Sequence, residues 1–418
     1  MRVFRLELKK ILKSRRTIIL IALSLFMSVL MAYLPVTFVS VSQYDEAGNK
    51  VASLKGLEAV RYTKILQEGI KGELTPEIMR HAVEEYQACM REYNAEGTWD
   101  LPGDVYYKRI FPIYPLLPRV REAFSDRKTG FAPAITDIAP EKVDNFYEAC
   151  DERIIALGEM EQKNSQAARQ FMRDKYRSVE KPYFYYPGYN SDAMDYELLL
   201  AILLLLFCTV IAAPAFSSDY QTGADDILRC TRHGRMRLGI SKTATVAGIS
   251  GILYTVCMTI YLLLSNSFFG WECTRTSMQV EYSVTSLANW NMGELQLAVM
   301  FAGLLTVIAT VCFTAFLSSR CRNVITSLSI GLVMCFAPIF IYMSIPDSFK
   351  PGLWMRCMLP SGGLGMMSSF LYSIIDYEFL TLGSLAVWTP YAMAGFAAVE
   401  IVIFSVTAVR SYMVHRVA

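Results

Sequence analysis

Six long stretches of this chain contain no charged residue, or only one. A helix needs about 20 apolar residues to cross the roughly 30 Å hydrocarbon core of a membrane, and every stretch is long enough. Hydrophobic residues make up 53% of the 418 residues. We therefore predict an all-α polytopic membrane protein with six transmembrane helices. The stretches are Thr17–Tyr44, Leu198–Ser218, Thr243–Trp271, Leu295–Ser319, Asn323–Pro346 and Phe379–Val409, the last of which contains Glu400.

The charged residues divide the chain into membrane and polar parts. Half of the basic residues lie in the long segment after the first stretch, which we predict to be a mainly helical extracytoplasmic domain inserted between helices 1 and 2. The predicted parts are an N-terminal helix over 1–16, span 1 over 17–40, the extracytoplasmic domain over 41–196, span 2 over 197–218, a cytosolic loop over 219–242, and spans 3 to 6 over 243–418.

Lysines and arginines in the short flanks predict the orientation. With the N-terminus inside, the inner flanks hold sixteen of them and the short outer loops hold three. Cytoplasmic loops carry the excess of basic residues, so both termini are predicted to be cytosolic. The membrane that we expect is the bacterial cytoplasmic membrane. The formal net charge of +2 gives no field that would attract nucleic acid.

The first residues form a basic helix with one apolar stripe. Phe4, Leu8, Ile11 and Leu12 share a helical face, and the basic residues lie elsewhere. This pattern predicts an amphipathic helix on membrane lipid at the inner leaflet. The alternative is a leader that only sets the topology. The uncharged run that follows is longer than a signal-peptide core, which favours a retained first helix.

The extracytoplasmic segment contains two clear helix signals. Thr75 is a predicted N-cap before Pro76, and a second helix is predicted from Pro140 to about Arg177. Cys89 and Cys150 are the only cysteines of this segment, so they are either a candidate disulfide or two buried free thiols. The other cysteines are scattered and form no C-x-x-C, which argues against a metal site.

Motifs for catalysis are missing from the sequence. It has no G-x-x-x-x-G-K-[ST], and its three histidines are far apart in the chain. Ser361–Gly363 lies in a predicted outer loop, where it is a turn rather than an ATPase signature. We predict no catalytic residue, no metal and no cofactor bound by this chain.

The charged segment between the second and third stretches has the pattern of a short helix. Thr222 and Asp225 resemble a capping box, and Ile227 and Leu228 lie on one apolar stripe. Acids come first and arginines last, which complements the helix dipole. An apolar stripe on a cytosolic helix over Thr222–Arg232 needs a partner.

This segment resembles the permease subunits of ABC-2-type ABC exporters. In that family an acid, a glycine, a Leu-Leu-like pair, a small-polar and Arg cluster and a lysine follow the second span in this order. This chain departs from the pattern in carrying Asp where the family usually has Glu, and in the additional acids Asp225 and Asp226. The matching residues are Asp219, Gly223, Ile227, Leu228, Thr231, Arg232, Arg235 and Lys242.

The resemblance implies a division of labour between subunits. Two permease subunits, identical or different, would pair, and separate cytosolic ABC ATPase subunits would bind ATP and Mg²⁺. The loop over 219–242 would carry the coupling helix, with Ile227 and Leu228 as buried anchors and the arginines as rim or lipid contacts. The segment near 350–384, which contains Leu359–Met367, would dip into the membrane from the outer side. The substrate would be amphipathic or lipid-like: a peptide antibiotic, a drug or a lipid.

Glu400 is the one acid deep inside an uncharged stretch. It precedes Arg410 by ten residues, which is about 15 Å of helix. A charge at that depth costs roughly 2.5–3.5 kcal/mol unless it is paired or hydrated. Glu400 is therefore either a polar contact on the substrate path or a structural contact between helices.

Two other functional classes compete with the exporter. One is a membrane-anchored sensor or assembly protein whose outer domain binds a ligand without transport. The other is a secondary transporter, against which the single deep acid and the lack of an evident inverted repeat both count.

Overall fold

The computed structural model describes residues 2–188, 191–229, 235–346, 349–383 and 385–414. Helices account for 72% of the structure, and six of them are long and apolar enough to cross a membrane, which confirms the predicted polytopic helical character. These helices are α2 (Arg15–Phe38), α9 (Asp192–Ala212), α12 (Met236–Phe269), α14 (Met292–Arg320), α15 (Val324–Ser344) and α18 (Thr389–Val414).

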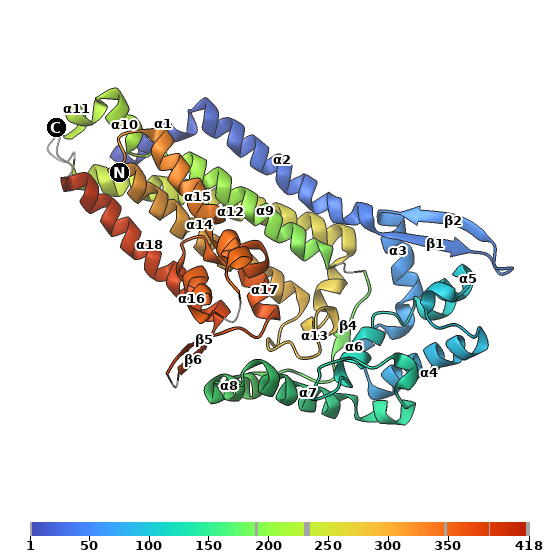
Figure 1. Ribbon diagram of the computed structural model, residues 1–418. Coiled ribbons are helices and arrows are strands. Elements are labelled where there is room, and N and C mark those ends of the chain that lie inside the picture. Colours follow the sequence, from blue (N-terminus) through green and yellow to red (C-terminus); the bar gives the residue numbers. More distant parts are fainter. Residues whose placement is uncertain (1, 189–190, 230–234, 347–348, 384, 415–418) are drawn as a thin grey trace.

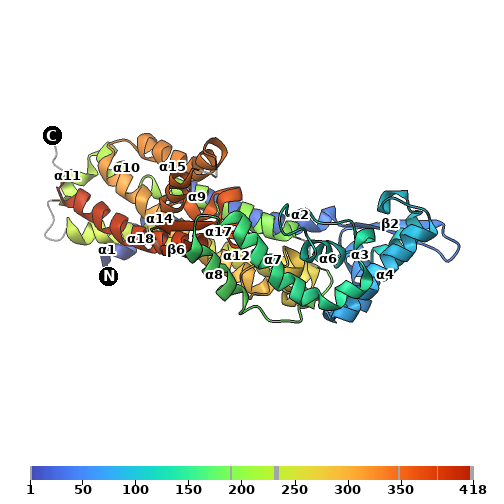
Figure 2. The same ribbon diagram turned by 60° about the horizontal axis from the view of Figure 1, so that its bottom comes forward.

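The six long helices run side by side, and the chain segments outside them gather at the two ends of the bundle (Figure 1). One end holds α1 (Arg2–Leu12), α10 (Ser217–Thr222), α11 (Ala224–Arg229) and the last turns of α18. The opposite end holds the segment between α2 and α9. Figure 2 shows that its helices α3, α4 and α6 extend well beyond the bundle.

The segment between α2 and α9 is mainly helical but also contains strands. An antiparallel hairpin, in which Val41 pairs with Leu54, comes directly after the first span. A second short pair joins Gly72 to Tyr185, which lies near the end of the segment. The elements are β1 (Ser40–Tyr44), β2 (Lys50–Lys55), α3 (Leu57–Leu66), β3 (Gly72–Glu73), α4 (Pro76–Glu92), α5 (Gly103–Val105), α6 (Leu117–Ala123), α7 (Phe146–Glu161), α8 (Gln166–Tyr176) and β4 (Phe184–Tyr185).

Two helix predictions for this segment have different outcomes. The N-cap at Thr75 is confirmed, because its hydroxyl accepts a hydrogen bond from the Ile78 N–H at 3.4 Å. The single helix predicted from Pro140 is wrong, since α7 and α8 are separate helices. Ser165 is the reason for the second start, because its side chain caps α8 by accepting from the Ala168 N–H at 3.2 Å.

The segment packs on the membrane bundle rather than standing apart from it. The buried Tyr176 hydroxyl donates to the carbonyl of Val284, which lies between α12 and α14, at 2.7 Å. The Phe171 ring on α8 contacts Phe379, with ring centroids 5.5 Å apart. One continuous hydrophobic cluster includes residues of both parts.

The last span begins later than the uncharged stretch predicts. A hairpin of β5 (Phe379–Leu382) and β6 (Leu385–Trp388) precedes α18. The Thr389 hydroxyl donates to the Glu378 carbonyl at 2.6 Å, which fixes the base of the hairpin at the helix start. Two short helices, α16 (Lys350–Met358) and α17 (Phe370–Ile375), occupy the segment before the hairpin, and α13 (Met278–Glu281) lies between α12 and α14.

Candidate functional site

The second span is broken near Pro214, and the break places the predicted coupling segment. Proline has no N–H and clashes with the preceding turn, so α9 ends two residues earlier. The N–H groups of Phe216 and Ser217 donate instead to the Ser318 hydroxyl of α14, each at 3.0 Å. That hydroxyl donates in turn to the Ala213 carbonyl at 2.7 Å. The Ser318 side chain of another span therefore hydrogen-bonds the backbone groups freed by the break, and it holds the start of α10 in place.

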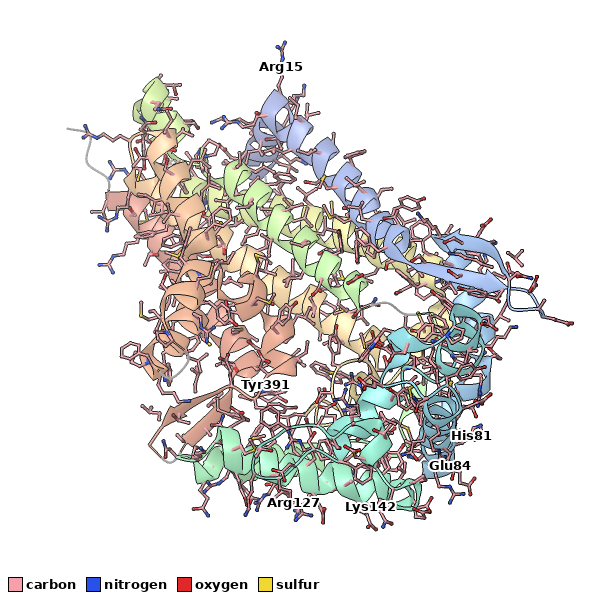
Figure 3. The ribbon with its side chains drawn as sticks, turned by 45° about the vertical axis from the view of Figure 1, so that its right-hand side comes forward. Arg15, His81, Glu84, Arg127, Lys142 and Tyr391 are labelled. Atoms are coloured by element: carbon pink, nitrogen blue, oxygen red, sulfur yellow. The ribbon has the colours of Figure 1, made fainter. Side chains whose placement is uncertain are left out.

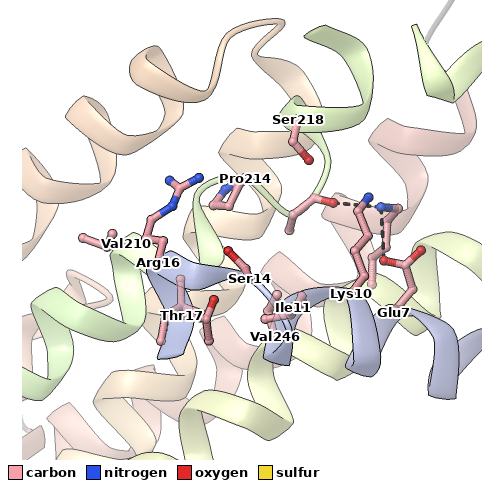
Figure 4. A pocket seen from close by; sticks show the side chains of 13 residues that line it. Glu7, Lys10, Ile11, Ser14, Arg16, Thr17, Val210, Pro214, Ser218 and Val246 are labelled. Carbon is pink, nitrogen blue, oxygen red and sulfur yellow. Dashed lines mark hydrogen bonds and ion pairs between the residues drawn. The ribbon is translucent and has the colours of Figure 1, made fainter. Parts of the chain in front are cut away.

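A cluster of four charged side chains joins α10 to two other helices. We call Glu7, Lys10, Asp219 and Lys242 the charge cluster. Asp219 accepts from Lys10 and from Lys242, with a distance of 2.6 Å in each pair. Lys242 also lies 3.0 Å from the Ala215 carbonyl and 3.5 Å from Glu7. Figure 4 shows Glu7 and Lys10 side by side on α1.

Burial makes the charge cluster costly to form unless its charges are paired. Lys242 is 2% exposed and Asp219 3% exposed. Taking such ions out of water costs several kcal/mol each, and the cost is offset only when both have close partners. The two acids and two bases provide that balance. Because α1, α10 and α12 each contribute a member, none of them can move far without separating buried charges.

Gly223 forms the joint between α10 and α11. Its φ of 68° is left-handed, a conformation that is unfavourable for a residue with a side chain. The predicted capping role of Thr222 is wrong, because Thr222 is the last residue of α10. Its hydroxyl donates back to the carbonyls of Ser218 at 3.1 Å and Asp219 at 3.3 Å. The helix after the second span is therefore two short helices with a glycine between them.

The predicted coupling residues separate into inward and outward groups. Asp219 is buried in the charge cluster, and Leu228 packs against the core of its own chain. Ile227 points outward with 76% of its surface exposed, and Arg235 is exposed directly before α12. Arg232 lies outside the described residues. The apolar pair thus divides, and Ile227 is the member of the pair whose surface is open to a partner.

Sequence reasoning missed three members of the charge cluster as site residues. Glu7 is the single acid among the basic residues of the N-terminal helix, and that exception was a usable signal. Lys242 stood out only by its order in the family pattern. Nothing local marks Lys10 among its basic neighbours, because its role depends on Asp219, 209 positions away.

The long helices also contain two acids that are buried or half-buried. Glu400 is half-buried on α18, and its Oε2 atom has no hydrogen-bond partner among the described residues. Sequence reasoning missed Glu197, which is 0% exposed on α9, with neither carboxylate oxygen hydrogen-bonded within the described parts of the chain. Glu197 directly precedes the uncharged stretch that begins at Leu198, so it was not counted as part of that stretch. The helix α9 in fact begins earlier, at Asp192, and includes it.

Cys89 and Cys150 are both free and buried in the structure, so the candidate disulfide is not formed. Burial raises the pKa of both thiols, which keeps them protonated and unreactive. Among the residues that the structure describes, no group of three His, Cys, Asp or Glu side chains could hold a metal ion.

Comparisons with known proteins do not place the chain in a family. No family model matches the sequence. A search of curated proteins finds no match either.

Proposed function

We propose that this chain is the membrane-spanning permease subunit of an ATP-driven exporter, powered by separate ATPase subunits that bind ATP and Mg²⁺. The observation that carries the proposal is the unit of α10 and α11. It exposes Ile227 at the end of the bundle where α1 begins, and it is tied through buried Asp219 to two other helices. An exposed apolar residue on an anchored helix has the form of a docking element.

The charge cluster supplies a route for mechanical coupling. A partner that pushes on α11 moves α10 through Gly223. Asp219 then carries Lys242 with it, because separating these two buried ions costs several kcal/mol. The exposed Lys10 of α1 follows through its ion pair with Asp219. Through these contacts a motion at the end of the bundle reaches α1 and the span α12, while the chain itself performs no chemistry.

The remaining parts of the proposal concern membrane and substrate. Both termini lie in the cytosol of a bacterial cell, which the basic flanks and the shared position of α1 and α11 support. A second permease subunit, identical or different, completes the path. The substrate is amphipathic or lipid-like, and this last assignment rests on family resemblance alone.

Capture of the ATPase tests the proposal. The full chain is expressed with its own ATPase subunits and purified through a tag on the permease. We expect Ile227→Asp to lower the amount of ATPase captured by about tenfold or more, because a charge would enter an apolar contact. The matched control is Ile65→Asp on α3, since Ile65 is 70% exposed at the opposite end of the molecule. Equal capture by the wild type and Ile227→Asp would refute the docking role.

A cavity at the end of α2 favours the second candidate function, ligand sensing without transport. It has a volume of about 470 Å³ and is lined by Phe38 of α2, by residues of the segment between α2 and α9, and by Val280 and Glu281 of α13. Two buried polar atoms in its lining residues, Thr63 Oγ1 and Arg119 Nε, have no hydrogen-bond partner among the described residues. Polar groups left unpaired around a cavity are suited to binding a small polar ligand. A ligand that binds the chain tightly in the absence of any ATPase would favour this function.

A further inference from the structure

A second cavity lies beside the charge cluster, where α1 turns into α2. Its volume is about 230 Å³. Figure 4 shows Arg16, Ser14 and Thr17 on one side of it and Lys10 and Glu7 on the other. Apolar side chains, among them Val210 of α9, make up much of the remaining wall. The lining of the cavity is therefore partly charged or polar and partly an apolar wall.

The charges around this cavity do not balance. Lys10 and Lys242 are matched by Asp219 and Glu7 within the charge cluster. Arg16 is exposed, and no acidic side chain of the described residues forms an ion pair with it. One positive charge is thus left over at the cavity. A guanidinium presents a fork of donors that suits a phosphate.

Two hydroxyl groups in the cavity wall also lack partners. Thr17 is only 5% exposed, yet its hydroxyl makes no hydrogen bond with any described residue. Ser14 precedes α2, and its side chain forms no capping hydrogen bond. Both hydroxyls line the cavity and can therefore donate a hydrogen bond to a ligand oxygen there. The cavity borders the first turn of the 24-residue helix α2, whose first N–H groups have no partner within the helix and favour an anion.

We propose that this cavity binds the phosphate headgroup of an anionic phospholipid. The cavity is at the end of span α2, so it lies at a membrane–water interface, where lipid headgroups are concentrated. It is too small for a whole phospholipid, which leaves the acyl chains outside it along the apolar wall. That wall distinguishes the site from one built for free phosphate. The inference requires only that the six helices cross a membrane, and it does not depend on transport.

The test measures thermal unfolding of the purified full chain in a non-ionic detergent. Dioctanoyl phosphatidylglycerol is titrated in, with dioctanoyl phosphatidylcholine and inorganic phosphate as separate arms. We expect a saturable rise in Tm with phosphatidylglycerol alone. Arg16→Gln should raise the half-saturating concentration by about tenfold or more, because it removes a charged phosphate contact. Thr17→Val, which keeps the shape of the side chain, should raise it by roughly fivefold.

Arg15→Gln is the matched control, because Figure 3 shows Arg15 pointing away from the rest of the molecule. This variant should respond to phosphatidylglycerol as the wild type does. Identical responses of the wild type, Arg16→Gln and Arg15→Gln would overturn the proposal, since they would mean attraction by general surface charge. A full response to inorganic phosphate at the same concentrations would overturn the lipid assignment and indicate a free anion instead.

Discussion

At the scale of single residues, Asp219 joins two lysines in very different surroundings. Both nitrogens lie 2.6 Å from its carboxylate. The Lys10 side chain is 52% exposed, whereas that of Lys242 is 2% exposed. Water screens an exposed pair and leaves it worth little, while a buried ion without its partner is strongly unfavourable. The two ion pairs have the same length, but the pair of Asp219 with Lys242 contributes more to stability than the pair with Lys10.

Replacement of each lysine should reveal this difference. Lys242→Met leaves Asp219 with only its exposed partner, and we expect it to lower the free energy of unfolding by about 3–5 kcal/mol. Lys10→Met should cost about 1 kcal/mol or less. Denaturant unfolding of the purified chain in detergent measures both values. Similar losses for the two variants would contradict the account of the charge cluster.

Glu281 gives a prediction for pH. Burial raises its pKa to about 7 from the ordinary 4.5, although the positive charge of Arg119 acts in the opposite direction. The folded state thus holds its proton more tightly than the unfolded state. Stability should be unaffected by this group below about pH 4.5 and should fall as pH rises toward 7, by up to about 1.4 kcal/mol per pH unit.

The matched measurement uses Glu281→Gln. This variant keeps the size of the side chain and removes its titration, so the fall in stability between pH 5 and pH 7 should become shallower. Unfolding midpoints at a series of pH values give the comparison. The same slope in the wild type and the variant would show that other groups carry the pH dependence.

At the scale of elements, the predicted coupling segment shows what sequence patterns can and cannot predict. The order of acids, apolar residues and arginines correctly indicated a helix that contains Ile227. It could not place the boundary, because Gly223 is compatible with either a helix interior or a helix end. Its left-handed conformation depends on α10, which is itself held by the charge cluster. Local sequence propensity therefore predicted that a helix contains Ile227, while long-range contacts determined that the segment is split into α10 and α11 at Gly223.

Gly223→Ala tests the joint between the two short helices. A Cβ atom would meet no neighbour within 4 Å, so the cost is conformational and amounts to about 1–2 kcal/mol. We expect a lower Tm and weaker capture of the ATPase. Gly248→Ala is the control, since that glycine lies inside α12, also has open space around it and has no left-handed φ. The control should be neutral or slightly stabilising.

At the scale of the whole molecule, the six spans were predictable because membrane helices need long uncharged runs. The packing of the segment between α2 and α9 on the bundle was not predictable in this way. It depends on contacts such as that of Tyr176 with Val284, which are 108 residues apart. The same holds for the pairing of Lys10 with Asp219. Composition sets the number of spans, whereas distant side chains set how the ends of the bundle are built.

The central claim is that α11 contacts an ATPase at the cytosolic end of this bundle. A photo-crosslinking amino acid at position 227, in cells that express the permease with its ATPase, tests it most directly. The account predicts a cross-link between the permease and the ATPase from position 227 and none from position 65, which is also exposed but lies at the opposite end. A cross-link from position 65, or none from position 227 while the two proteins still purify together, would contradict it.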